Sequence, residues 1–225
     1  MIDLKQGKFV LVYDSEKREG ETDFVIAAEF VTPTSIQTMR TEGGGLIFLM
    51  IPHLIAQRFQ LPFLADIYTD INSSYPVLKA LDPNDIPYDT KSSFSVYINH
   101  RQTFTGITDN DRSLTVRKFA KLIQNTEAMS TTNALDALGT EFRSPGHVPI
   151  CIASPNLLHE RKGHTELVIA LLQMAGVTPA GSGCEMMGNN GLALSKEDAQ
   201  SFAHKHHLTF VEGKDIISTW KTWQK

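Results

Sequence analysis

The sequence predicts an α+β fold, a single domain in which helices cover a mixed β-sheet. Short apolar runs of strand length alternate with segments whose apolar residues repeat at helical spacing. Several of these runs are separated by turn-rich stretches, which favour hairpins and therefore antiparallel neighbours in the sheet. The chain has 225 residues, 41% of them apolar, which is enough for one buried core and fits a single domain spanning 1–225.

The first half of the chain begins with two apolar runs on either side of a charged turn. They predict strands at 8–13 and 23–30, which we expect to pair. A helix should start at Thr32 as N-cap and end at the glycines 43–45, which either stop it or let backbone approach a ligand; stopping a helix is the commoner use. The elements that follow are a central strand at 46–51, a short helix at 52–59, an ambiguous stretch at 61–82, a surface loop at 82–89 and a half-buried strand at 93–100.

The second half continues this alternation of helices and strands. A helix is expected at 113–123, and 124–140 reads as a connection with one short helix at 133–138. The remaining elements are an apolar strand at 148–153 after a Pro-Gly turn, a helix that ends at Gly176, a loop at 178–191, a helix from Ser195 to about His207, a strand at 208–211 and a helix at 214–223. Ser195 and Asp198 have the spacing of a capping box.

Composition and charge narrow the classes of function. Lysine and arginine are scattered along a chain of net charge −4, which predicts no nucleic-acid partner. The longest apolar run, at 46–51, is too short to span a bilayer, so no membrane association is expected, and the first residues lack the apolar core of a signal peptide. Sparse cysteine, at Cys151 and Cys184, favours a reducing, cytoplasmic compartment.

The charged turn between Tyr13 and Asp23 is the densest cluster of ionisable residues in the chain. It carries five carboxylates and two cations, namely Asp14, Glu16, Glu19, Glu21, Asp23, Lys17 and Arg18. Oxygen ligands at this density suit Mg²⁺ or a polyhydroxy substrate. Hairpin turns are also commonly charged and solvated, so the turn by itself leaves both interpretations open.

Two more polar segments lie beside predicted elements. The loop 105–112 precedes the helix at 113–123, and it is either an anion site at a helix N-terminus or a set of capping residues. His147 directly precedes the strand at 148–153. A histidine at a strand start is commonly structural, but it is also the side chain best suited to proton transfer near neutral pH.

A third polar segment opens the helix that ends at Gly176. Arg161, Gly163, His164 and Thr165 lie at its amino end. An arginine and a hydroxyl at a helix N-terminus suit a phosphate, and a histidine beside them suits a metal or a general acid. The alternative is an ordinary N-cap with an incidental histidine.

Taken in order, these stretches match one family. The matching motifs are REGETD at 18–23, TGITDNDR at 105–112, FRSPGHV at 142–148, GHTE at 163–166 and CEMMG at 184–188. Over nearly its whole length the chain resembles 3,4-dihydroxy-2-butanone-4-phosphate synthase, in the form without a fused GTP cyclohydrolase II domain. The resemblance implies an α+β lyase of riboflavin biosynthesis that converts D-ribulose 5-phosphate to L-3,4-dihydroxy-2-butanone 4-phosphate and formate. It also implies Mg²⁺ or Mn²⁺, two ions per active site, no organic cofactor, and a homodimer with active sites at the subunit interface.

The resemblance further implies roles for individual residues. Glu19 and His164 would bind the metal. Substrate contacts would come from Arg18, Glu19, Asp23, Arg161, Gly163, His164, Thr165 and Glu185, with Arg18 and Asp23 on the sugar and Arg161 and Thr165 on the phosphate. The candidates for proton transfer are His147, Glu185, Asp23 and Glu21, and the sequence does not assign a particular proton to any of them.

The chain departs from the family pattern at one position, and two other functions are compatible with its residues. Some relatives carry a cysteine in the strand after the glycine segment, where this chain has Phe48 and Leu49, so no thiol is expected there. A metal-dependent sugar-phosphate isomerase or epimerase would share the enediol step and use similar residues. A non-catalytic sugar-phosphate binding module would bind without turnover. Only the lyase releases formate.

Overall fold

The computed structural model describes residues 1–126 and 128–223, and its strands form one mixed sheet in that part of the chain. Seven strands lie in the order β4-β5-β3-β6-β2-β1-β7. Their bounds are β1 Val10–Tyr13, β2 Thr22–Ala27, β3 Phe48–Ile51, β4 Phe94–His100, β5 Phe142–Ile152, β6 Gly181–Glu185 and β7 Thr209–Glu212. The pairs β1–β7 and β3–β5 are parallel, and the other neighbours are antiparallel. The predicted α+β class with a mixed sheet is therefore confirmed.

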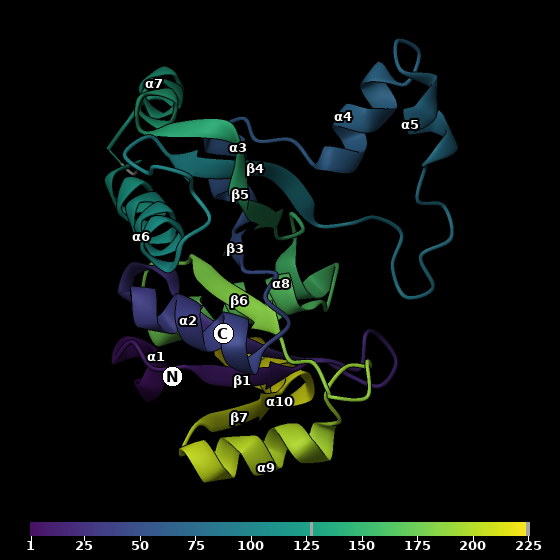
Figure 1. Ribbon diagram of the computed structural model, residues 1–225, viewed down its shortest axis with the longest axis vertical. Coiled ribbons are helices and arrows are strands. Elements are labelled where there is room, and N and C mark those ends of the chain that lie inside the picture. Colours follow the sequence, from purple (N-terminus) through teal and green to yellow (C-terminus); the bar gives the residue numbers. More distant parts are fainter. Residues whose placement is uncertain (127, 224–225) are drawn as a thin grey trace.

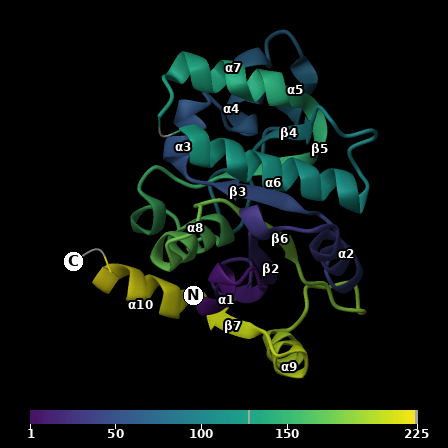
Figure 2. The same cartoon turned by 90° about the vertical axis from the view of Figure 1, so that its left-hand side faces the viewer.

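Helices cover both faces of the sheet (Figure 1). One apolar layer holds side chains of α2 Pro33–Glu42, α3 His53–Arg58, α6 Asp109–Thr126, α7 Thr131–Glu141 and α9 Lys196–His206. The other holds side chains of α1 Ile2–Lys5, α8 His164–Ala175 and α10 Gly213–Trp223. Figure 2 shows α8, α1 and α10 together, away from α6. Because alternate strand residues face opposite sides, each layer receives every second side chain of the central strands.

Two short helices stand apart from these layers. They are α4 Leu64–Ile71 and α5 Pro76–Ala80, in the stretch that the sequence left ambiguous, and neither has a fully buried side chain. In Figure 1 they project away from the sheet, and an extended segment leads from them back to β4. None of the helices within the described residues combines the length and apolar character that a membrane crossing requires.

The predicted loop at 178–191 is wrong in its first half, because β6 lies there between β3 and β2. Its glycines explain why no strand pattern is visible. A Cβ at Gly181 would lie 2.7 Å from Val168 Cγ1, and one at Gly183 would lie 3.0 Å from the Phe24 carbonyl oxygen. Close approach of α8 and the neighbouring strands thus excludes the larger residues by which a strand is normally recognised.

The predicted Pro-Gly turn before His147 is also wrong, because β5 runs through it. Between the pairs Ile98↔Val148 and Asn99↔Arg143 the register shifts, so the intervening residues of β5 form a bulge. The Ser144–Pro145 peptide bond in this bulge is cis. The helices predicted at 113–123 and 133–138 are longer than expected, running over Asp109–Thr126 and Thr131–Glu141.

Candidate active site

A cavity of about 440 Å³ lies at one edge of the sheet, where the β1–β2 turn, the end of β6 and the start of α8 meet. Its lining includes eight residues that the sequence predicted for the site: Arg18, Glu19, Glu21, Asp23, Arg161, His164, Thr165 and Glu185. They come from stretches that are far apart in the chain. The fold therefore brings three of the five motifs into one cavity.

The acidic turn is held in shape by a carboxylate that the sequence did not single out. Asp14 has a fully buried side chain. Its Oδ2 accepts a hydrogen bond from the Glu19 backbone N–H at 3.0 Å, and its Oδ1 accepts one from the Glu21 N–H at 3.2 Å. Charge-assisted bonds of this kind are among the stronger ones in proteins. The buried Asp14 carboxylate therefore holds the backbone of the turn in place, and Glu19 of this turn lines the cavity.

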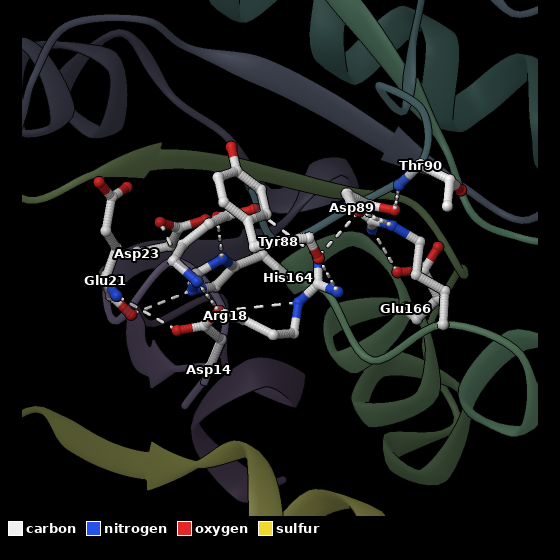
Figure 3. Close-up of polar contacts among 11 residues, drawn as sticks. Asp14, Arg18, Glu21, Asp23, Tyr88, Asp89, Thr90, His164 and Glu166 are labelled. Atoms are coloured by element: carbon white, nitrogen blue, oxygen red, sulfur yellow. Dashed lines mark hydrogen bonds and ion pairs between the residues drawn. The ribbon is translucent and has the colours of Figure 1, made fainter. Parts of the chain in front are cut away.

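His164, the first residue of α8, connects this turn to the helix (Figure 3). Its Nδ1 lies 3.1 Å from Glu19 Oε2, and its Nε2 lies 3.2 Å from the Glu21 carbonyl oxygen. Asp14, Glu19 and His164 each offer one ligand atom, all within 4.8 Å of one another. Carboxylate and imidazole donors at this separation could hold a divalent cation.

One carboxylate oxygen of Asp23 has no hydrogen-bond partner among the described residues. Its Oδ1 is buried without a hydrogen bond and lies 3.8 Å from His164 Nε2. Burial raises the pKa of Asp23. Burial would lower the pKa of His164, but the charge of Asp23 and the hydrogen bond to Glu19 outweigh it and raise that pKa. An unsatisfied buried carboxylate oxygen beside a histidine fits a site built to receive a cation or a substrate hydroxyl.

Glu185 and Glu21 are the other carboxylates of the cavity whose protonation the fold alters. Burial raises the pKa of Glu185 and of Glu21, and the charge of Glu19 adds to the effect on Glu21. Glu185 stands opposite Asp23 in the β2–β6 ladder. Its carbonyl oxygen accepts a hydrogen bond from Gly44 N–H at 2.7 Å. The glycine segment thus ends α2, as predicted, and also supports the strand end that carries Glu185.

The other end of the cavity lies at the amino end of α8 and carries two arginines, Arg18 and Arg161, each paired with a carboxylate. Arg161 Nη1 donates to Glu166 Oε2 at 2.6 Å, and its Nε donates to Asp89 Oδ2 at 2.7 Å. Glu166 is fully buried, and its Oε1 accepts a hydrogen bond from Ser154 N–H. The helix N-terminus adds partial positive charge beside Thr165. This end could bind an anion.

Gly163, the N-cap of α8, is needed because Arg161 packs over it. A Cβ at Gly163 would lie 2.2 Å from Arg161 Nη1 and 2.6 Å from Cζ. Gly163 has φ −82°, which any residue can adopt, so backbone strain does not explain the glycine, and the three atoms nearest to the Cβ position all belong to the Arg161 guanidinium. Gly163→Ala should displace Arg161 and weaken inorganic phosphate binding by about tenfold, the equivalent of one charge-assisted hydrogen bond.

Isothermal titration calorimetry with phosphate measures this effect, and the circular dichroism spectrum serves as the control for folding. Gly139→Ala in α7 is the matched substitution, because a Cβ there meets nothing within 4 Å. Phosphate binding of wild-type strength in Gly163→Ala would show that Arg161 does not depend on this glycine.

His147 is the one predicted site residue that lies neither on this cavity nor next to it. Its Nδ1 lies 3.1 Å from Asn99 Nδ2, and its N–H donates to Asn99 Oδ1 at 2.9 Å. The Asn99 amide also reaches the Thr105 carbonyl oxygen at 3.5 Å. His147 and the 105–112 motif therefore form a second cluster on β4, β5 and the start of α6.

Sequence reasoning missed other residues that line the cavity. Cys151 of β5 lines it together with Phe48 of the adjacent parallel strand, so a thiol is present although the β3 position holds phenylalanine. Burial raises the pKa of Cys151, so the thiol stays neutral near pH 7. Tyr88 and Asp89 line the cavity from the predicted surface loop, and no signal in that loop points to them.

A family model described as 3,4-dihydroxy-2-butanone 4-phosphate synthase matches residues 1–219. The chain belongs to this family. The synthase of Methanothermobacter thermautotrophicus is 43% identical over 96% of this chain and 92% of its own, and that of Archaeoglobus fulgidus is 41% identical over 98% and 92%. A riboflavin biosynthesis protein, RibBA of Staphylococcus epidermidis, is 33% identical over 96% of this chain and 47% of its own. The family is thus an enzyme family of riboflavin biosynthesis.

Solved synthase structures share the fold. A two-domain synthase from A. baumannii superimposes with a TM-score of 0.74 at 27% identity, over 96% of this chain and 55% of its own. A synthase in a cation-free form gives a TM-score of 0.75 at 23% identity, over 100% of this chain and 96% of its own. A synthase in complex with two magnesium ions gives 0.73 at 23% identity, over 98% and 94%. At that identity the last two comparisons concern the fold alone.

Proposed function

We propose that the chain converts D-ribulose 5-phosphate to L-3,4-dihydroxy-2-butanone 4-phosphate and formate, with Mg²⁺ or Mn²⁺ and without an organic cofactor. The observation that carries the proposal is the single cavity with an acidic, histidine-bearing end and a cationic end. A phosphorylated sugar has the matching polarity, because its hydroxyls and carbonyl lie at one end and its phosphate at the other. Membership of the synthase family supports this substrate over other phosphorylated sugars.

The metal ligands in this proposal are Glu19 and His164, and Asp14 is the third donor within reach. When bound, a divalent cation supplies Lewis-acid stabilisation for the negative charge that develops on neighbouring oxygens of the sugar. Glu19 is suited to the role because the hydrogen bond to His164 lowers its pKa despite burial, which keeps it ionised. We propose two ions per site, as the resemblance to the synthase family implies; one solved synthase is described as a complex with two magnesium ions.

Proton transfers are assigned to three other carboxyl groups of the cavity lining, those of Asp23, Glu185 and Glu21. Burial raises the pKa of Asp23 to about 8, and it also raises the pKa values of Glu185 and Glu21 above the usual range of a carboxyl group. A raised pKa favours the protonated form, which a general acid needs. Asp23 and Glu185 face each other across paired strands. Two neighbouring carboxyls that do not both ionise provide an acid and a base in one site.

The phosphate is assigned to Arg161 and Thr165. Both line the cavity, and the amino end of the twelve-residue α8 adds its dipole. Arg18 belongs to the acidic turn, and its guanidinium lies 3.9 Å from Glu19 Oε1 and 2.9 Å from Asp89 Oδ2, which also contacts Arg161. That position suits contact with the sugar hydroxyls rather than with the phosphate alone.

We further propose a homodimer in which His147 of a second copy completes each site. His147 lies outside the cavity of its own chain, beside an exposed loop. In that loop Phe104 is 94% exposed and Ile107 is 49% exposed. Exposed aromatic and aliphatic side chains next to a functional residue are typical of an interface. A cytoplasmic location remains a prediction from the sparse use of cysteine.

Mixed dimers test this arrangement. Glu19→Gln and His147→Asn should each be nearly inactive alone, while the two chains co-expressed should regain about a quarter of wild-type activity, since random pairing puts both intact residues in one site of half the dimers. The measurement is the rate of formate release per subunit, with size-exclusion chromatography to establish the dimer. If the co-expressed chains are no more active than the single variants, His147 acts in the site of its own subunit or takes no part in the reaction.

Product analysis separates the proposed reaction from its rivals. Proton nuclear magnetic resonance of the reaction mixture should show one formate for each D-ribulose 5-phosphate consumed. A rearranged five-carbon sugar phosphate without formate would indicate an isomerase or epimerase. Binding of the sugar phosphate without consumption would indicate a binding module.

A further inference from the structure

Asp89 bridges the two arginines of the cavity from a segment outside the family motifs. Its Oδ2 accepts hydrogen bonds from Arg18 Nη2 at 2.9 Å and from Arg161 Nε at 2.7 Å. The preceding residue reinforces the contact, because the Tyr88 ring lies 5.8 Å from the Arg18 guanidinium carbon and its carbonyl oxygen accepts from Arg18 Nη1. Figure 3 shows Arg18, Tyr88 and Asp89 gathered beside His164.

The segment that carries Asp89 forms part of the cavity lining and is called the strap below. We define the strap as residues 82–93, which link α5 to β4 without forming a helix or strand. It lines both the cavity of about 440 Å³ and a second one of about 750 Å³, and Arg18, Tyr88, Asp89 and Arg161 also line both. Withdrawal of the strap would join the two spaces.

No residue of the strap is fully buried. The helices before it, α4 and α5, contain no fully buried side chain. Besides its contacts with the two arginines, the strap has an exposed ion pair between Lys91 and Asp66 at 2.8 Å. The Lys91 ammonium also lies 3.9 Å from the centre of the Phe63 ring, and at the last strap residue the Ser93 carbonyl oxygen accepts a hydrogen bond from Ile152 N–H at 2.9 Å. Exposed ion pairs contribute little, and segments with few buried apolar contacts open at low free energy.

Asp89 occupies the edge of Arg161 that a phosphate would need. The Nη1 of Arg161 donates to the fully buried Glu166, so a phosphate that takes two hydrogen bonds from this guanidinium must use Nε, where the Asp89 carboxylate accepts its bond. A phosphate placed beside Asp89 would meet a like charge at close range. The two anions are therefore alternatives for the same donor.

We infer that Asp89 is an internal competitor of the substrate phosphate, and that the strap swings away from Arg18 and Arg161 when the substrate binds. This inference rests on the proposed phosphate site at Arg161. In the free protein Asp89 keeps the two guanidinium groups paired and ordered. An anion must displace it, so the observed affinity equals the intrinsic affinity multiplied by the fraction of molecules with the strap open.

Phosphate titration of two variants tests the inference. Asp89→Asn should bind inorganic phosphate about tenfold more tightly than wild type by calorimetry, as expected if about nine molecules in ten are closed. The KM for D-ribulose 5-phosphate should fall in parallel. Asp85→Asn is the matched control, since it removes the same charge from the same strap at an exposed residue without an ion pair in the described part of the chain. It should leave phosphate affinity at the wild-type value.

Three outcomes are informative. Tighter phosphate binding in Asp89→Asn but not in Asp85→Asn supports the inference, and Asp89→Ala should repeat the direction. Equal or weaker binding in both Asp89 variants, with their circular dichroism spectra unchanged, overturns it. Arg161→Gln distinguishes this failure from a failure of the proposed function: if it binds phosphate as wild type does, the phosphate site itself is misplaced.

Discussion

Glu19→Gln should lower kcat by at least about 100-fold and weaken Mg²⁺ binding, because it removes one of the two proposed metal-ligating side chains. Glutamine has the size of glutamate and can still hydrogen-bond His164, so the turn should keep its shape. The backbone N–H of residue 19 would still donate to Asp14 Oδ2. The loss should therefore be confined to charge and metal affinity.

Glu16→Gln is the matched control for this variant. Glu16 lies in the same turn and carries the same charge, but its side chain is 73% exposed and its partner is Lys196 at 3.5 Å. Calorimetric titration with Mg²⁺ and the thermal midpoint of each variant complete the comparison. Wild-type metal affinity in Glu19→Gln would remove Glu19 from the metal site.

Asp14→Asn should destabilise the fold by about 2–4 kcal/mol as well as abolish activity, because the buried carboxylate accepts two backbone hydrogen bonds that an amide cannot both accept. One oxygen would become an NH₂ group directed at the N–H of Glu19 or Glu21. The acidic turn would then lose the bonds that shape it. Urea denaturation without metal measures the change in the free energy of unfolding.

The stability measurement decides between two roles for Asp14. Its oxygen lies close enough to Glu19 and His164 to serve as a metal ligand, and it also shapes the turn. If Asp14 shapes the turn, Asp14→Asn should be less stable than wild type even without metal, whereas Glu19→Gln should keep wild-type stability. Unchanged stability in Asp14→Asn combined with lost Mg²⁺ affinity would make Asp14 a ligand rather than a support.

Elements defined by local signals were predictable from the sequence. The N-caps Thr32 and Ser195 bind the backbone three residues ahead, and Gly176 ends α8 in a left-handed conformation. These contacts lie within a few residues, so the local sequence contains them. Strand β6 was missed because glycine is required there by close contact with α8 and with the neighbouring strands. Those contacts come from distant parts of the chain, so the local sequence does not reveal them.

Some residues of the candidate site could likewise be predicted from the local sequence, and others could not. The residues at 18–23 and 161–165 could be named because each motif is contiguous, although only the fold shows that they share a cavity. Asp89 could not be named, since its partner Arg18 is 71 residues away and nothing in the surrounding loop marks it. The placement of His147 outside the cavity depends on the bulge in β5.

Formate release from D-ribulose 5-phosphate, measured on chelator-treated protein before and after Mg²⁺ is restored, tests the central claim most directly. The proposal predicts no formate from the metal-free protein and one formate per sugar phosphate once Mg²⁺ is added. It also predicts that metal-free protein remains folded, since Asp14 shapes the turn without an ion. Undiminished formate release in excess chelator, or none from folded protein with Mg²⁺ or Mn²⁺ present, would contradict a metal-dependent lyase.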